Sequence, residues 1–359
     1  MMLKMKNLAP ILLMLCYFYF CYFINPSDSG KQKLSNFTCL VLPACLLYVA
    51  LAAKSKDIYY FLLFLVVFGL FLTCVAFVFK TINPMYFLVT GNREGRSWTY
   101  IQYGPLACSA GLILIVWSME KKSWLFSRIL QMVLGCFCLA GVIYSGERGS
   151  ILFVPLILLI YFFCSKRVRN ILKSRKNIWL VILFLAANIS IMRFIQSDQG
   201  EVFRDRFKRL SQDSLNSESG IDARLDTSGE FYSGFKRTMA ESPIFGSGPG
   251  NYFGFNSSLY PHILVLEIGG EYGLLGLGFY LFVLISIIKG MKNVYSFWPP
   301  AIFFAYFNVV LLYFFRTFKT GDLAGSRYYW ILVSIYIVYS KAKKIHAKKK
   351  KIDENFNRS

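Results

Sequence analysis

One of the two histidines in the chain, His262, stands where a polar segment enters a long apolar run; the other, His346, lies in a lysine-rich tail. An imidazole titrates near neutral pH. At the end of a membrane helix, His262 is therefore suited to take a proton from a substrate docked at the membrane surface. The alternative interpretation is a histidine that caps its helix at the membrane interface.

Arg148 lies between two apolar stretches, in the short sequence Ser-Gly-Glu-Arg-Gly-Ser. A guanidinium at that depth is costly unless an anionic group meets it. The small neighbours Gly146, Gly149 and Ser150 would let a phosphate approach closely. The adjacent Glu147 is the alternative partner, in a purely structural ion pair.

Two further segments carry candidate residues. Arg224 precedes a run of aromatic residues, and its alternative interpretation is a solvated surface arginine. Asp322 and Arg327 come just before the last apolar stretch, where they either pair with each other or contribute to a site. Arginine presents forked donors that match phosphate oxygens. A lone base near several arginines indicates a site for an acidic, membrane-tethered substrate.

Glu267 and Glu271 are four residues apart on the expected helix after His262, so they share a face, which we expect to point into the helical bundle. The sequence has no Asp-x-Asp and no histidine-rich element, and the nine cysteines lie mostly in apolar stretches. We therefore expect no metal, no cofactor and no disulfide framework. Negative charge on a departing phosphate would be stabilised by arginines alone.

The elements that must position these residues are membrane helices. The chain has 359 residues, 56% of them hydrophobic, and a mean hydropathy of +0.48, which excludes an ordinary soluble domain. We predict an all-α, polytopic helical bundle of about ten transmembrane helices. The first segment lacks a small-x-small cleavage site, so we expect it to be retained. The expected spans are 7–24, 37–53, 58–79, 101–118, 127–144, 149–164, 178–195, 262–288, 298–316 and 327–341.

Charge predicts how the bundle is oriented. If both termini are cytoplasmic, more than half of the 40 Lys and Arg residues fall on the cytoplasmic side, including the basic tail 342–359. The net charge of +21 is then mainly a topology signal rather than a nucleic-acid-binding patch. We predict one polytopic domain, 1–359, in the inner membrane.

The exterior side carries one large loop, 196–261. We expect a short helix within 226–240, followed by turns at 243–250, where Gly and Pro alternate. Loops of this length are usually functional or disordered. Aromatic residues such as Phe235 and Tyr252 argue against disorder. The alternative is that these aromatics lie along the membrane interface.

Four motifs together resemble a known family: Arg148 in its glycine turn, Arg224 upstream of the Pro-x-x-Gly-x-Gly sequence 243–248, His262 running into Glu271 and Gly276, and Gly321-Asp322 with Arg327. In this order, over about residues 80–340, they are similar to the O-antigen polymerase and O-antigen ligase superfamily. These proteins are integral-membrane glycosyltransferases of the C type. One departure is Ile263, where the family often has Asn after the histidine.

The resemblance implies an O-antigen or surface polysaccharide polymerase that acts at the periplasmic face on undecaprenyl-pyrophosphate-linked repeat units. It implies inverting, metal-independent transfer, with His262 as general base and Arg148 and Arg224 on the pyrophosphate. Asp322, Arg327 and Glu271 are expected to organise the site or the acceptor. A chain-length regulator protein is a further expected partner, and nucleic acid is not one.

Three other interpretations stay open. An O-antigen ligase, which transfers glycan to lipid A-core, shares this chemistry, but about ten spans favour the polymerase over the twelve usual in ligases. A lipid-linked oligosaccharide flippase or exporter would need charges within many spans, whereas the spans before residue 145 are nearly free of ionisable residues. A non-catalytic membrane scaffold would not need an arginine between apolar stretches, as Arg148 is, or a histidine at a helix end, as His262 is.

Overall fold

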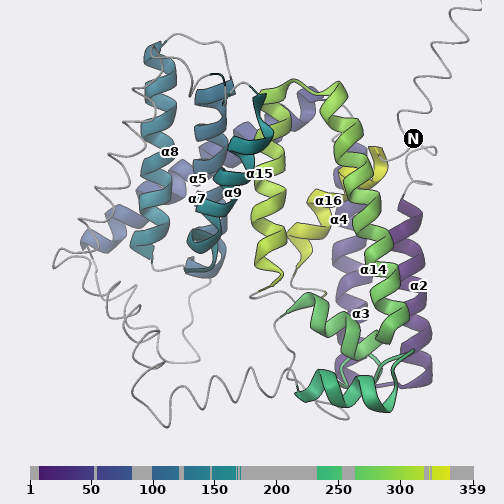
Figure 1. Ribbon diagram of the computed structural model, residues 1–359. Coiled ribbons are helices and arrows are strands. Elements are labelled where there is room, and N and C mark those ends of the chain that lie inside the picture. Colours follow the sequence, from purple (N-terminus) through teal and green to yellow (C-terminus); the bar gives the residue numbers. More distant parts are fainter. Residues whose placement is uncertain are drawn as a thin grey trace, which may run out of the picture. The chain divides into compact units, whose positions relative to one another are not determined.

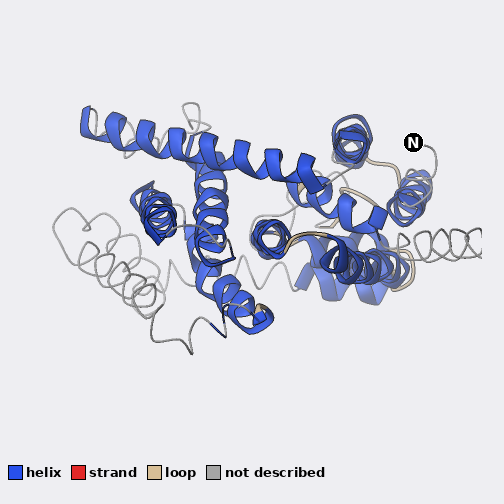
Figure 2. Cartoon of the chain, turned by 90° about the horizontal axis from the view of Figure 1, so that it is seen from above, coloured by secondary structure: helices blue, strands red, loops and turns tan. Residues whose placement is uncertain are grey.

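The chain folds into helices connected by turns and loops. A computed structural model describes residues 8–51, 55–82, 99–120, 125–145, 148–166, 168, 170, 233–252, 263–318, 323 and 326–339. In these ranges every regular element is a helix (Figure 2). Helices occupy each predicted span that falls within the described residues. The span 178–195 lies outside them, as do residues 196–232 and 253–261 of the predicted loop 196–261.

The chain divides into two compact units, each assembled from separate stretches of sequence. Unit 1 contains Met1–Ser55, Ala223–Pro299 and Arg316–Ser359, whereas unit 2 contains Lys56–Asp222 and Pro300–Phe315. Unit 1 thus joins the first helices of the chain to the segments that carry most of the predicted site motifs.

Unit 1 is built on α14 (Leu264–Phe297), which contacts both α16 (Arg327–Tyr339) and α2 (Ala9–Ile24) (Figure 1). Aromatic side chains fill these contacts: Phe18 of α2 stacks on Tyr272 of α14, with ring centroids 3.7 Å apart. The Trp330 ring of α16 meets Tyr280 edge-on at 6.1 Å. Large buried rings therefore hold the three helices together.

The second predicted span of unit 1 begins earlier than expected. Helix α3 (Asp28–Asn36) runs through a π-helical turn, η2 (Phe37–Val41), into α4 (Leu42–Leu51). The Ser27 side chain caps α3 by accepting a hydrogen bond from Gly30 N, and Asp28 lies in the first turn, where a carboxylate favours the helix dipole. The predicted span begins only at residue 37, whereas the polar residues before it already form the first turns of this membrane helix.

Helix α14 also continues beyond its predicted end, through Lys289 and Lys292, to Phe297. The helix ends because Trp298 precedes Pro299, and a residue before proline is disfavoured in helical geometry. Trp298 accordingly has an extended backbone (φ −92°, ψ 146°).

Unit 2 contains α5 (Ser55–Ile82), α7 (Thr99–Glu120), α8 (Leu125–Ser145), α9 (Arg148–Cys164) and α15 (Pro300–Arg316). The extensive contact between α7 and α8 is close because Gly111 faces Gly135, and small residues let membrane helices approach. Phe153 of α9 stacks on Phe315 of α15 with ring centroids 5.3 Å apart. Only two residues separate the end of α8 from the start of α9, fewer than the four between the predicted spans.

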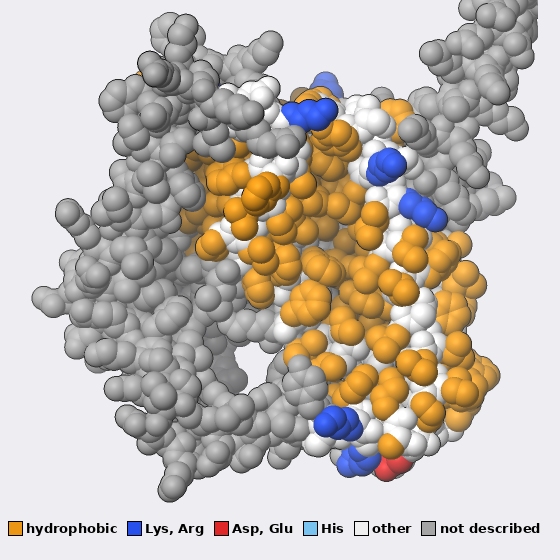
Figure 3. All heavy atoms as spheres, in the orientation of Figure 1, with side chains coloured by type: hydrophobic (Ala, Val, Ile, Leu, Met, Phe, Trp, Pro, Cys, Tyr) orange, Lys and Arg blue, Asp and Glu red, His pale blue; other side chains and the backbone are white. Residues whose placement is uncertain are grey.

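The helices have the composition of membrane spans. Three are long and apolar enough to cross a bilayer (Asp28–Ala50, Lys56–Val75 and Leu264–Phe297), and five shorter apolar helices accompany them in the described part of the chain. On the face drawn in Figure 3, hydrophobic side chains cover most of the described surface, and the Lys and Arg side chains lie mainly toward its upper and lower parts. The prediction of an all-α membrane protein is confirmed at this level. The number of spans and their orientation stay predictions.

Candidate functional site

A break in α14 organises the candidate site. Gly273 lies inside the helix but has non-helical dihedral angles (φ 66°, ψ −163°). A left-handed φ of this kind favours glycine, and any Cβ here would collide with the backbone of Ile244. The break removes the usual helical hydrogen bonds around Gly273, and in a membrane helix each freed backbone group needs another partner.

The Gly- and Pro-rich loop 242–252 supplies those partners. Ser247 N donates to Gly270 O and Gly248 N donates to Glu271 O, each at 2.9 Å. In the other direction, Leu274 N donates to Pro243 O at 2.9 Å and Leu275 N to Ile244 O at 3.3 Å. The loop therefore restores on both sides the backbone bonds that the helix loses.

Two of the four sequence motifs thus form one structure. The first glycine of the Pro-x-x-Gly-x-Gly sequence, Gly246, has φ 75° and lies against the backbone of Glu271 and Tyr272, where no Cβ would fit. Tyr17 of α2 donates its hydroxyl to Tyr272 O at 2.8 Å and so satisfies one more carbonyl at the break. The motif after His262 and the glycine motif before it depend on each other.

The same loop is fixed to the start of α3. Ser27 Oγ donates to Pro249 O at 2.6 Å, and Ser29 Oγ donates to Gly250 O at 3.1 Å. The turn of the loop rests on Gly30, whose missing side chain leaves room for the Pro249 carbonyl. The first helices of the chain therefore help to shape a loop more than two hundred residues later.

Beneath the loop, Lys33 of α3 meets two carboxylates of α14. Its Nζ lies 2.5 Å from Glu267 Oε1 and 2.6 Å from Glu271 Oε1. Both glutamates are fully buried, and the Lys33 side chain is only 11% exposed. As predicted, the two carboxylates share a face that points into the bundle. Their pairing with a buried cation offsets part of the cost of placing them there.

Glu267 also connects α14 to the segment before α16. Its Oε2 accepts a hydrogen bond from Leu323 N at 2.9 Å. Close by in the chain, Leu264 N donates to Thr317 O at 3.0 Å. The first turn of α14 is thus tied to α3 through Lys33, and also to Thr317 and Leu323.

Of the predicted site residues, the structure describes the side chains of Glu271 and Arg327. Glu271 is part of the Lys33 ion pair, and Arg327 begins α16, where its exposed guanidinium lies 5.3 Å from the Tyr328 ring centroid. Arg148 is the first residue of α9, and its side chain is not described. His262, Arg224 and Asp322 lie outside the described residues. Leu264, two residues after His262, donates its backbone N–H to Thr317 O. Leu323, directly after Asp322, donates its backbone N–H to Glu267 of α14.

Sequence reasoning missed Lys33. It stands in a short polar stretch between two apolar ones, where a lysine ordinarily reads as a solvated loop charge. The available signal was the cap Ser27-Asp28, which starts a helix and carries Lys33 toward the bundle. Glu271 lies 238 positions further along the chain, so nothing in the sequence indicates that this lysine pairs with it.

Comparison with known proteins finds a family model that covers part of this site. Residues 132–281 match the family model described as O-antigen ligase, a segment that contains Arg148, the glycine loop, His262 and the break in α14. The match confirms the resemblance to the O-antigen ligase and polymerase superfamily. Among curated proteins, no match to this chain is found.

Proposed function

We propose that this chain, as a member of the O-antigen ligase and polymerase superfamily, is a polymerase of a bacterial surface polysaccharide. Its donor is a growing glycan on undecaprenyl pyrophosphate, and its acceptor is a second lipid-linked repeat unit. The reaction takes place at the periplasmic face of the inner membrane. Glycosyl transfer in general follows from the family match.

The proposed chemistry is a single inverting displacement. An acceptor hydroxyl attacks the anomeric carbon of the donor sugar as the bond from that carbon to the phosphate oxygen breaks. His262 takes the proton of the hydroxyl, and undecaprenyl pyrophosphate leaves as an anion. Arg148 and Arg224 stabilise the pyrophosphate charge with their forked donors.

The observation that supports this proposal most directly is the anchoring of α14 at its start. Lys33, the glycine loop and Leu323 hold the helix that follows His262 from three sides, with buried polar contacts. A general base must be held at a fixed distance from its substrate, and such fixed surroundings provide this. Ionisable groups buried in a membrane helix, as Lys33, Glu267 and Glu271 are, often mark a functional site, which also supports the proposal.

Asp322 and Arg327 are proposed to orient the acceptor sugar. Asp322 immediately precedes Leu323, whose amide donates a hydrogen bond to Glu267, five residues after His262 in the chain. For Glu271 the ion pair with Lys33 favours a role in holding α14 rather than direct contact with substrate.

The second candidate is an O-antigen ligase, and the description of the matching family model favours it. The ligase uses the same donor, base and arginines but transfers the finished glycan to lipid A-core. The two functions differ only in the acceptor.

The lipopolysaccharide band pattern of a strain lacking this chain tests the proposal and separates the two functions. Loss of the polymerase leaves core carrying a single repeat unit, because the ligase still transfers unpolymerised units. Loss of the ligase leaves bare core and an accumulation of lipid-linked polymer. An unchanged ladder of bands, with the polymer still exported, would contradict both functions.

A further inference from the structure

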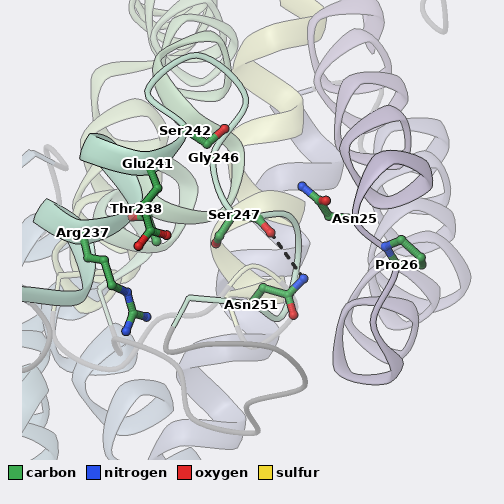
Figure 4. A pocket seen from close by; sticks show the side chains of 9 residues that line it. All are labelled: Asn25, Pro26, Arg237, Thr238, Glu241, Ser242, Gly246, Ser247 and Asn251. Atoms are coloured by element: carbon green, nitrogen blue, oxygen red, sulfur yellow. Dashed lines mark hydrogen bonds between the residues drawn. The ribbon is translucent and has the colours of Figure 1, made fainter.

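An open cavity lined mainly by residues with polar side chains lies beside the glycine loop in unit 1. It has a volume of about 620 Å³, within the range of about 300–1,000 Å³ typical of small-molecule sites. Three segments line it: Asn25 and Pro26 after the end of α2, the helix 233–241, and the loop that follows this helix (Figure 4). In Figure 4, Arg237, Thr238 and Glu241 lie on one side, Asn25 and Pro26 on the other, and Ser247 and Asn251 between them.

The lining indicates the chemical class of the ligand. Most of the lining side chains are neutral groups that form hydrogen bonds: Asn25, Thr238, Ser242, Ser247 and Asn251. Its charged side chains, Arg237 and Glu241, have opposite signs, so the cavity has no excess of positive charge to attract pyrophosphate. It also has no large aliphatic or aromatic side chain to hold a lipid tail. Neutral hydroxyl-bearing sugars fit this chemistry best.

Several lining residues are held in place by contacts with the backbone. Asn251 Nδ2 donates to Ser247 O at 3.3 Å, and Ser247 Oγ donates to Gly270 O at 3.2 Å. Arg237 Nη2 donates to Tyr252 O at 3.3 Å. This contact uses one of the five guanidinium N–H donors and orients the rest. Because these groups are already ordered, a bound sugar would lose little affinity to their ordering.

The cavity is built from the same loop that repairs the break in α14. Ser247 lines the cavity, and its backbone and side chain both bind the Gly270 carbonyl, one residue before Glu271. The exposed ring of Pro26 and the carbon stems of Arg237 and Glu241 also offer apolar surface to the C–H faces of a sugar ring.

We propose that this cavity binds a neutral saccharide unit of the lipid-linked oligosaccharide, apart from the groups that bind its pyrophosphate. The assignment rests on the proposed function, because it names the part of that substrate which the cavity recognises. Hydrogen bonds that sugar hydroxyls accept from Arg237, donate to Glu241 and share with the neutral lining residues would select among repeat units.

Binding of a lipid-free sugar to the full-length protein in nanodiscs tests this proposal. The probe is the neutral oligosaccharide repeat unit released by hydrolysis from the polysaccharide of the producing cells, followed by saturation-transfer NMR. Ser242→Trp fills the cavity and should weaken binding by at least about tenfold. Arg237→Gln removes one or two hydrogen bonds and should weaken binding by about threefold to tenfold. The matched control is Lys236→Gln on the same helix, exposed and outside the lining, which should bind as the unchanged protein does.

Each result decides the question. Equal affinity in Arg237→Gln and Lys236→Gln would overturn the proposal, as would displacement of the oligosaccharide by equimolar inorganic pyrophosphate. Thermal unfolding in the same nanodiscs shows whether Ser242→Trp is folded; if it is not, Arg237→Gln alone decides. Because binding is measured without turnover, it separates the two proposals. Sugar binding lost in Arg237→Gln, in a protein that transfers no glycan, would keep the cavity assignment and reject the proposed function.

Discussion

At the scale of single residues, the proposed chemistry depends on a base and on arginines that the sequence makes visible. His262 is conspicuous because the only other histidine lies in a lysine-rich tail, and Arg148 because it interrupts apolar sequence. Such residues are recognised by type and by their place relative to apolar segments, which requires no knowledge of tertiary contacts.

His262→Ala should leave the protein folded and inserted but reduce glycan transfer by about 10²–10⁴-fold, because a general base contributes that much to the rate. The measurement is the chain-length distribution of lipopolysaccharide in cells that express the variant at normal abundance. His346→Ala is the control and should give the normal distribution. Near-normal polymer from His262→Ala would remove this residue from the mechanism.

Arg148→Lys should lose most of its activity even though the positive charge remains. A lysine ammonium is a point charge and cannot form the paired contacts that a guanidinium makes with phosphate oxygens. Turnover of lipid-linked repeat units by the purified variant checks this. The structural alternative makes the opposite prediction: full activity in Arg148→Lys, with activity destroyed in Glu147→Ala, would show that the two residues form an ion pair.

Lys33 shows what the sequence could not reveal at this scale. The location of the Glu267 and Glu271 side chains in the bundle follows from helical periodicity and from the cost of exposing carboxylates to lipid. Their partner belongs to another helix far away in the sequence, and only the folded chain brings it near. Periodicity describes one helix at a time, so it does not identify contacts between helices.

At the scale of elements, the ion pairs of Lys33 join α3 to α14. Lys33→Met leaves two buried carboxylates next to each other without their cation, and should destabilise the protein by about 3–5 kcal/mol. The midpoint of thermal unfolding in detergent measures the loss. Lys31→Met, an exposed position on the same helix, is the control and should unfold near the normal temperature. Equal midpoints for the two variants would show that the ion pairs contribute nothing to stability.

The break in α14 makes a second prediction at this scale. Gly273→Ala forces a side chain into left-handed backbone geometry and against Ile244, and should cost about 1–3 kcal/mol from strain alone. Gly278 lies on the same helix with no neighbouring atom near its missing side chain, so Gly278→Ala should be neutral or stabilising by up to about 1 kcal/mol. Unfolding midpoints of the two variants check this. Similar values for both would mean that the break is not needed.

Most elements were predictable from apolar length, because a bilayer fixes how many residues a span needs. The residues at which the helices begin and end were harder to predict. Helix α3 begins at Asp28 because Ser27 caps it and the glycine loop binds it, and α14 runs to Phe297 because only Pro299 stops it. The pairing of the loop with Gly270 and Glu271 was invisible because it consists of backbone bonds, which leave no pattern of side chains.

At the scale of the whole molecule, the first turns of α14 gather polar contacts from parts of the chain that are far apart in sequence: α3, the loop 242–252, Thr317 and Leu323. Such an arrangement suits an enzyme whose substrates arrive along the membrane. The lipid pyrophosphate is already an activated leaving group, so the proposed reaction needs no energy from a nucleotide sugar.

Purified protein should therefore turn over undecaprenyl-pyrophosphate-linked repeat units in the presence of EDTA, and should ignore nucleotide sugars. Arginines provide the charge stabilisation that a divalent ion provides in many enzymes that use nucleotide sugars. The sequence has no Asp-x-Asp motif and no histidine-rich element of the kinds that usually hold such an ion. Glycan products are followed by gel mobility with EDTA and with Mg²⁺ or Mn²⁺ in parallel. Activity that disappears with EDTA and returns with either ion would reject the arginine-only mechanism and make Asp322 and the loop carboxylates the candidate ligands.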